Sequence, residues 1–273
     1  MGTVTEPVPA EGTLPAPDWL GRVAPRWVVG AAAAVLVLAW GLTLAGARWS
    51  LFGLPTHLWL DLFNNRPVEW LQWVLLGLVV AGAAFLAGRL YGGPQHRAAA
   101  FFGLLALAGA FMLIEEAGDV RHVISDYVYS WFGGHIFGLP YRVVSDVPYF
   151  AALAFLPLYA VVRYGRYAWR ARSLRGYLVA GYGLYGLAAG GSALRHLRGL
   201  YSRAGELLSR PLFGERLPLP PDMSAERLYF LLIDGPVEES VELLASACLL
   251  AAVAAFARDH AAGRVPGDTP PPG

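Results

Sequence analysis

Three separate segments of a very apolar chain carry ionisable side chains at spacings that suit chemistry. The first is "FMLIEEAGDVRH" (111–122), which ends an apolar stretch with three acids, an arginine and a histidine. On a single helix, Glu115, Asp119 and His122 follow one another at i, i+4 and i+7 and therefore share one face. Carboxylate and imidazole groups on one face are suited to binding a divalent metal or to transferring protons.

The second segment is "IDGPVEESVELLAS" (233–246), in which acids again recur at helical spacing. Glu238 and Glu242 stand at i, i+4 on one face, and Glu239 with Glu242 forms an alternative i, i+3 face. The Asp-Gly-Pro sequence at 234–236 predicts the start of a helix, with the acid as N-cap and the proline in the first turn.

The elements that must position these residues are long apolar stretches, since crossing a bilayer takes about 20 such residues. Six of them lie at 27–47, 69–90, 98–116, 148–164, 176–195 and 236–257. All six are expected to be helices, because lipid offers no partner for free backbone groups. The predicted fold class is therefore all-α, a polytopic integral membrane protein built as a bundle of six transmembrane helices.

The composition agrees with this prediction. The chain is 56% hydrophobic and only 15% charged, whereas soluble domains carry about 25% charged residues. The lipid bilayer is thus the main expected partner, and a formal net charge of +1 gives no field that would favour nucleic acid. Residues 1–20 and 261–273, rich in proline and glycine, are expected to be disordered tails around one transmembrane domain, 21–260.

Arginines around the short loops predict the orientation. With the N-terminus inside, the short inner loop 163–175 carries five arginines, so both termini are expected in the cytoplasm and the protein in the cell membrane. The first stretch has features of a secretory signal peptide, with Ala45-Gly46-Ala47 as the cleavage site. Its apolar core exceeds the roughly 7–15 residues of such a signal, so we expect it to remain as the first helix.

The up-and-down topology brings the polar segments to one end of the bundle. A third polar cluster, formed by Arg195, His196 and Arg198, ends the fifth stretch. The third and fifth helices run in one direction and the sixth returns. The end of the third, the end of the fifth and the start of the sixth therefore face the same water, whichever way the protein is inserted.

A metal-dependent enzyme is one interpretation of this convergence. Clustered carboxylates with histidine bind Zn²⁺, Mn²⁺ or iron within helical bundles. The candidate ligands of a divalent metal cofactor are Glu115, Asp119, His122, His196, Glu238 and Glu242. The di-iron pattern needs Glu-x-x-His twice, whereas this chain offers only Asp119-x-x-His122, which argues against iron in particular.

Acid–base catalysis on a lipid-like small molecule is compatible with the same cluster. Glu116 or Glu239 would act as the general base. Arg121, Arg195 and Arg198 would neutralise an anionic head group. A membrane enzyme of this kind, with or without the metal, is the working hypothesis.

Two alternatives stay open at this point. A small ion- or proton-coupled transporter would use the acids as a titratable relay, and the Asp-Gly-Pro break at 234–236 is typical of a discontinuous helix. A non-catalytic membrane protein would use the same charges as interfacial salt bridges and helix caps.

The sequence also makes predictions about two connecting segments and one glycine motif. Residues 117–147 and 199–227 lie on the polar side, either as ordinary connections or as cover over a pocket between the helices. The prolines of 199–227 predict an extended link, and Ser224 is expected to begin a short helix. Gly186-x-x-x-Gly190 predicts a seam where a neighbouring helix packs closely.

Overall fold

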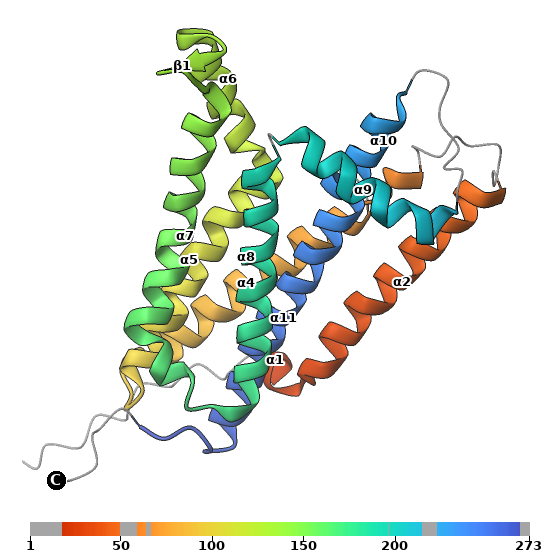
Figure 1. Ribbon diagram of the computed structural model, residues 1–273. Helices are drawn as coiled ribbons and strands as arrows, with labels where there is room; N and C mark the ends of the chain where they lie inside the picture. Colours follow the sequence, from red (N-terminus) through yellow and green to blue (C-terminus); the bar gives the residue numbers. More distant parts are fainter. Residues whose placement is uncertain (1–17, 50–58, 64–66, 196, 215–222, 268–273) are drawn as a thin grey trace, which may run out of the picture.

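The chain folds as a bundle of long helices that run up and down beside one another (Figure 1). The computed structural model describes residues 18–49, 59–63, 67–195, 197–214 and 223–267. The long helices of the bundle are α2 (Pro25–Trp49), α4 (Pro67–Tyr91), α5 (His96–Gly118), α7 (Tyr141–Ala168), α8 (Arg175–Leu194) and α11 (Glu238–Ala261).

Shorter elements connect the long helices. They are α1 (Asp18–Arg22), α6 (Val120–Phe132), the strands β1 (His135–Ile136) and β2 (Leu139–Pro140), the 3-10 turn η2 (Arg172–Leu174), α9 (Arg198–Phe213), α10 (Ala225–Leu232) and the π-helical turn η3 (Ile233–Val237). The two strands pair as an antiparallel hairpin, with His135 opposite Pro140. The all-α prediction is therefore confirmed, since this hairpin is the only sheet in the described part of the chain.

Within the described residues, five helical segments are long and apolar enough to cross a membrane: α2, α4, α5, α7 and the continuous stretch 225–261. Their length and composition are compatible with an integral membrane protein. A helix, α8, also forms where the fifth span is predicted, but it is not among these five. The count of six spans and the insertion itself therefore stay predictions.

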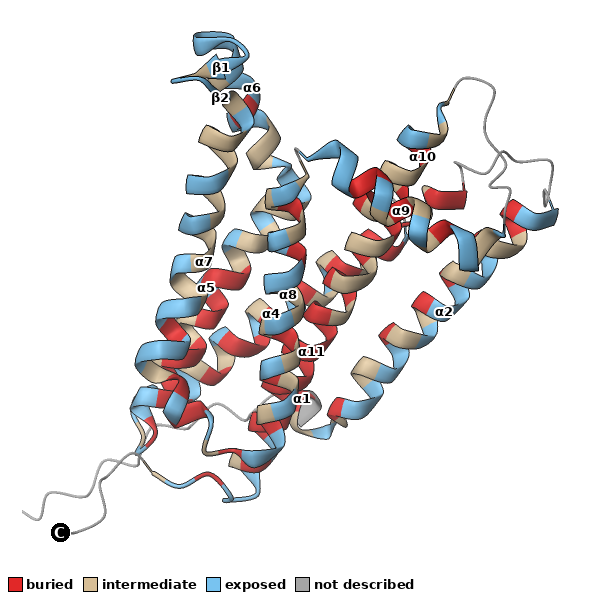
Figure 2. Cartoon of the chain, in the orientation of Figure 1, coloured by how far each residue is buried: buried red, intermediate tan, exposed pale blue. Residues whose placement is uncertain are grey.

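Helix α11 lies at the centre of the bundle, in contact with α2, α4 and α8. Figure 2 shows it buried along most of its length, as expected because residues 243–257 are apolar on nearly all sides. Its Phe256 packs on Phe102 of α5, with the ring centroids 4.6 Å apart. A Cβ added to Gly181 of α8 would lie 2.7 Å from the Leu249 side chain, so this glycine lets α8 approach α11 closely.

Helix α7 occupies the outside of the bundle and packs mainly on α5 and α6. Its apolar side chains are largely exposed, and Figure 2 shows few buried positions along it. Phe155 and Val162 are examples, with 64% and 86% of their surface accessible. Such a surface is suited to contact with lipid.

The segment 117–147 is more ordered than a connecting loop. Helix α5 ends at Gly118, because Asp119 adopts a left-handed conformation with φ of 48°, and α6 starts directly after it. The hairpin follows, and α7 begins at Tyr141, before the predicted residue 148. In Figure 1 the arm formed by α6 and the hairpin projects from one end of the bundle.

The prediction of an extended link over 199–227 is wrong for its first half. Residues 198–213 form α9, which lies across the ends of the long helices in Figure 1. Gly205 lets α9 approach α10 closely, since a Cβ there would lie 2.0 Å from the Tyr229 carbonyl oxygen of α10. The prolines at 218, 220 and 221 lie outside the described residues. Ser224 does cap α10, as predicted, by accepting from the Arg227 N–H at 3.3 Å.

The predicted helix start at Asp234-Gly235-Pro236 is also wrong. These residues form the π-helical turn η3, which joins α10 to α11 without interruption. A π-turn widens the backbone by one residue, and this accommodates Pro236 within a continuous helix. At the other end of α11, residues 262–267 are held against the bundle, since Gln95 Nε2 donates to the Val265 carbonyl oxygen at 2.7 Å. The predicted disordered tail therefore does not begin at 261.

Candidate functional site

The structure brings the three polar segments together at one end of the bundle. Ser192 of α8 donates a hydrogen bond to Glu238 of α11. Arg195, directly after α8, donates to the Asp234 carboxylate at 2.6 Å. Glu116 of α5 lies within electrostatic range of Glu238. The predicted convergence of these segments is therefore present in the fold.

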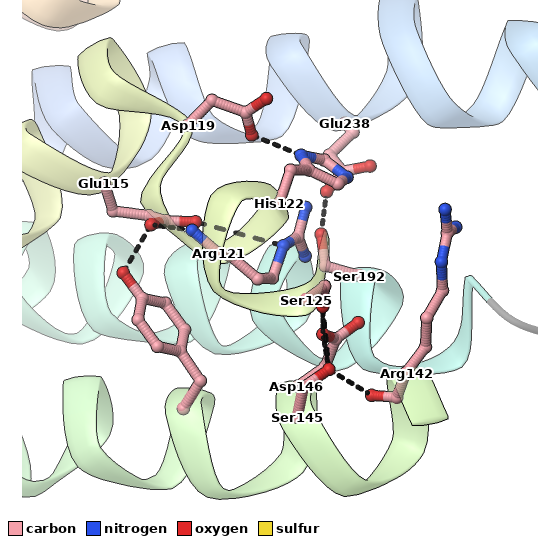
Figure 3. A network of polar contacts seen from close by, with 11 residues as sticks. Glu115, Asp119, Arg121, His122, Ser125, Arg142, Ser145, Asp146, Ser192 and Glu238 are labelled. Atoms are coloured by element: carbon pink, nitrogen blue, oxygen red, sulfur yellow. Dashed lines mark hydrogen bonds and ion pairs between the residues drawn. The ribbon is translucent and has the colours of Figure 1, made fainter. Parts of the chain in front are cut away.

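Glu115 points toward α6 and α7 in Figure 3. It accepts hydrogen bonds from the backbone N–H of Arg121 at 3.0 Å and from the hydroxyl of Tyr149. The Arg121 guanidinium lies 5.0 Å from the centre of the Phe150 ring, and its side chain is only 11% exposed. Glu115 thus fixes the start of α6 and holds Arg121 inside the protein.

Glu116 lies on the other side of α5 and joins a group of carboxyls that we call the acid cluster. Its members are Glu69, Glu116, Glu238, Glu239 and Glu242. Glu242 accepts from Gln72 Nε2 at 3.0 Å, and one oxygen of Glu239 is buried with no hydrogen-bond partner among the described residues. Helices α4, α5 and α11 therefore all contribute to the cluster.

Sequence reasoning missed the contribution of α4, although a signal was present. Glu69 and Gln72 stand at i, i+3 within a span that is otherwise apolar, which places them on one helix face. Both are buried in the bundle. A polar pair inside a predicted span is itself a sign of a functional interior.

Acids outnumber the cations that face them in this cluster. Arg121 acts on Glu116, and Arg121 and Arg195 both act on Glu238. Among the described residues, two guanidiniums thus oppose the four carboxyls of Glu116, Glu238, Glu239 and Glu242. Neighbouring carboxylates repel one another and burial penalises unpaired charge, so such a group is expected to hold protons and exchange them. Interfacial salt bridges account for Glu115 with Arg121 and for Asp234 with Arg195, but not for this excess of acids.

A cavity of about 480 Å³ opens beside the cluster, between α5, α7, α8 and α11. We call it the apolar cavity, because most of its wall is hydrocarbon. The charged and polar groups at one end are Glu115, Glu116, Arg121, Ser192 and Glu242. Along α5 the wall runs from Leu105 to Glu116, about 16 Å at 1.5 Å per residue. The cavity is therefore a long slot with one polar end.

The glycine motif of α8 lines this cavity instead of packing against a helix. A Cβ added to Gly186 or to Gly190 would meet nothing within 4 Å, whereas the close approach of α8 to α11 occurs at Gly181. The prediction of a packing seam at Gly186 and Gly190 is therefore wrong. Their missing side chains leave room for the cavity.

Tyr185 of α8 is a further group on the cavity wall that sequence reasoning missed. Its hydroxyl shares a hydrogen bond of 2.5 Å with Ser246 of α11. It also lies within electrostatic range of Glu116 and Glu242. A tyrosine inside an apolar span looks like packing in the sequence, so only the fold reveals this position.

The predicted metal ligands do not assemble into a metal site. Asp119 and His122 bond to each other at the protein surface, where the Asp119 side chain is 68% exposed, because α5 ends at Gly118 and the expected stripe is broken. His196 lies outside the described residues. Among the described residues, no three His, Cys, Asp or Glu side chains come close enough to hold a metal ion. Arg198, predicted for the same site, lines a separate cavity with Arg195.

We compared the chain with known protein families, curated proteins and solved structures. No protein family, no curated protein and no solved structure matches the chain. The function is therefore argued from the cavity and its polar end alone.

Proposed function

We propose that the protein is a membrane-embedded enzyme that performs acid–base chemistry on a lipid-like substrate held in the apolar cavity. One observation carries the proposal. Glu116 borders the polar end of the cavity and also lies within electrostatic range of other carboxyls of the acid cluster. A group in this position can exchange a proton with a bound substrate on one side and with the cluster on the other.

The shape of the cavity supports a substrate with a tail and a polar head. Its volume of about 480 Å³ lies in the usual range for small-molecule sites, roughly 300–1,000 Å³. Apolar side chains such as Leu105, Leu158 and Leu249 line the part away from the acids. Since α7 packs mainly on α5 and α6, a lipid tail would enter from the bilayer between α7 and α8.

In this mechanism Glu116 removes a proton from a water whose oxygen attacks the substrate, and returns that proton to the substrate oxygen whose bond breaks. Glu239 stands behind it and passes protons on, since its free oxygen is buried next to Glu116 and Glu238. Arg121 supplies a fixed positive charge at the cavity end for an anionic head group or a developing oxyanion.

The arginine-rich loop 163–175 supports the orientation in which both termini are cytoplasmic. The site lies at the end of the bundle opposite residues 262–267 in Figure 1. The polar end of the cavity would therefore open toward the outer face of the cell membrane.

A proton-coupled transporter is the second candidate, and the π-helical turn η3 (Ile233–Val237) favours it. Irregular helices beside buried acids are typical of ion-coupled carriers. Such a carrier would use the same carboxyls to move protons across the membrane without changing a lipid chemically.

The test is to reconstitute the full chain into vesicles of mixed phospholipids and isoprenoid alcohols. Lipid composition is followed by mass spectrometry and lumenal pH by a trapped dye. Wild type is compared with Glu116→Gln and with Glu206→Gln, a control on α9 where the partly exposed Glu206 pairs with Arg210, at 2.7 Å.

A new lipid product that Glu116→Gln abolishes and Glu206→Gln preserves supports the enzyme. Proton flux that depends on Glu116 without any new product rejects the enzyme in favour of the transporter. Neither product nor flux, with correctly folded protein, overturns both.

A further inference from the structure

A second cavity, of about 780 Å³, lies at the same end of the bundle and is rich in arginine. Three parts of the chain form it: the hairpin with the start of α7, the end of α8 with the start of α9, and α10. We call it the arginine pocket. Its cationic side chains are Arg142, Arg195, Arg198 and Arg227, with His135 beside them.

Positive charge exceeds negative charge in the arginine pocket. Among its lining residues four arginines face two acids, Glu226 and Asp234, and Asp126 and Asp146 outside the lining also act on Arg142. Arg195 is paired with Asp234, whereas Arg198 and Arg227 have no carboxylate within ion-pair distance among the described residues. Gathering cations around one cavity costs repulsion, and a bound anion relieves it.

Arg142 is oriented but keeps hydrogen-bond donors available. Its Nε donates to the Tyr141 hydroxyl at 3.0 Å. In Figure 3 the Arg142 side chain extends away from the contacts among Ser125, Ser145 and Asp146, and only its carbonyl oxygen joins them. Among the described residues, no hydrogen bond from the terminal nitrogens of Arg142 accompanies the one from Nε. Helix α9 also begins at Arg198, and the first N–H groups of a helix favour anions.

The arginine pocket lies next to the polar end of the apolar cavity. Ser192 lines the apolar cavity and Arg195 lines the arginine pocket. The two residues are three positions apart at the end of α8, which corresponds to about 4.5 Å of helix rise. The two cavities are therefore neighbours along the end of α8.

We propose that the arginine pocket binds the phosphate group of an amphiphile whose tail occupies the apolar cavity. Guanidinium groups suit this ligand, because their planar pairs of N–H donors match phosphate oxygens. The pocket also draws its arginines from three chain segments, so it surrounds the anion. This inference rests on the proposed function for the role of the apolar cavity and specifies the substrate class.

The test measures binding to the full chain purified in digitonin, by calorimetry, with three probes: dodecyl phosphate, dodecanol and inorganic phosphate. We expect dodecyl phosphate to bind at least about tenfold more tightly than dodecanol, because one charge-assisted contact is worth that much. Arg198→Gln combined with Arg227→Gln should weaken dodecyl phosphate binding by at least about 30-fold.

The matched control is Arg203→Gln combined with Arg210→Gln. It removes the same number of positive charges, but from two positions of α9 that lie outside the lining of the arginine pocket. Equal binding of dodecyl phosphate and dodecanol would overturn the proposal, and so would equal losses in the two double variants. Inorganic phosphate that binds as tightly as dodecyl phosphate would assign the pocket to free phosphate and reject the amphiphile. Thermal midpoints of all variants verify that they are folded.

A further variant tests whether one ligand occupies both cavities. Gly186→Leu places a side chain in the apolar cavity, so it should weaken dodecyl phosphate and leave inorganic phosphate unchanged. Binding and lipid turnover, measured together, separate this inference from the proposed function. Selective binding of dodecyl phosphate without any turnover of lipid would reject the enzyme alone. Turnover of lipid without preference for phosphate would reject the arginine pocket alone.

Discussion

The two ends of the helix bundle differ in how their charged side chains are paired. At the closed end, near the last turn of α11, Asp259 accepts from Arg264 at 2.7 Å and from the Ser173 hydroxyl at 2.6 Å. At the open end, buried acids outnumber their cations and two cavities lie beside them. The charges of Asp259 and Arg264 at the closed end therefore hold the chain in place, whereas the open end holds ion pairs together with further buried acids.

Tyr167 at the closed end lies among three arginines. Its ring lies within 5.1 Å of the guanidiniums of Arg97 and Arg170 and 4.7 Å from that of Arg166. The Arg166 terminal nitrogen also donates to the Tyr167 hydroxyl at 2.6 Å. Several cations thus share one aromatic ring. The contrast teaches that charge near a membrane surface indicates a functional site only where its partners are missing.

The largest expected difference between the ends is catalytic. Glu116→Gln should reduce lipid turnover by about 100-fold or more, as loss of a general base generally does. Asp259→Asn at the closed end should leave turnover within about twofold of wild type. A twofold change corresponds to less than 1 kcal/mol of activation free energy. Rates of product formation in vesicles measure both. Equal losses would indicate that the two ends are alike and would remove the case for Glu116.

The next difference is in stability. Arg195→Ala should cost about 3 kcal/mol of unfolding free energy, because it leaves the Asp234 side chain, which is 3% exposed, without its cation. Arg264→Ala should cost about 1 kcal/mol, because the Arg264 side chain is 59% exposed and Asp259 keeps its bond from Ser173. Denaturant titration in detergent compares them. A larger loss for Arg264→Ala would reverse the comparison.

Much of the open end is predictable from sequence, because helix direction follows from the order of apolar stretches. Each predicted stretch becomes a helix, although α7 begins at Tyr141 instead of 148 and the last helix continues back to 225. The helix directions bring Glu116, Ser192 and Glu238 to one end. The individual partners are not predictable in this way. Asp119 turns the chain with a single left-handed residue, and this turn separates Glu115 and Glu116 from His122.

Spacing motifs were less informative than chain direction. The Gly186-x-x-x-Gly190 spacing is the same whether a helix or a cavity lies opposite, so the sequence does not distinguish them. The Asp-Gly-Pro sequence at 234–236 predicts a helix start, but the neighbouring helices hold it as a π-turn within a continuous helix. Packing against the rest of the bundle, which no local pattern encodes, decides such cases.

A glycine pair on α8 sharpens the comparison between packed and open surfaces. Gly181→Leu should cost about 2 kcal/mol, because its Cβ would lie 2.7 Å from the Leu249 side chain. Gly186→Leu should cost less than about 0.5 kcal/mol, because its Cβ meets nothing within 4 Å. Thermal unfolding in detergent measures the two. A Gly186→Leu variant as unstable as Gly181→Leu would mean that the apolar cavity is filled by protein.

The smallest difference concerns two serines that each donate to a carboxylate, one at each end. Ser192→Ala and Ser173→Ala should each lower stability by about 1 kcal/mol, because each removes a hydrogen bond to a carboxylate, that of Glu238 or that of Asp259. The Ser173 hydroxyl also contacts the Ala255 carbonyl oxygen, at 3.3 Å. Only Ser192→Ala should also change turnover, by about fivefold, and shift its pH profile, because Glu238 adjoins Glu116.

Ser192→Thr, which keeps the hydroxyl, should restore the profile if Ser192 acts by positioning Glu238. Rescue of stability without rescue of the pH profile would contradict that role. A pH profile that Ser173→Ala shifts equally would show that turnover responds to general loosening of the bundle. In that case the acids of the open end would have no special part in the pH dependence of turnover, because Ser173 at the other end of the bundle would affect it equally.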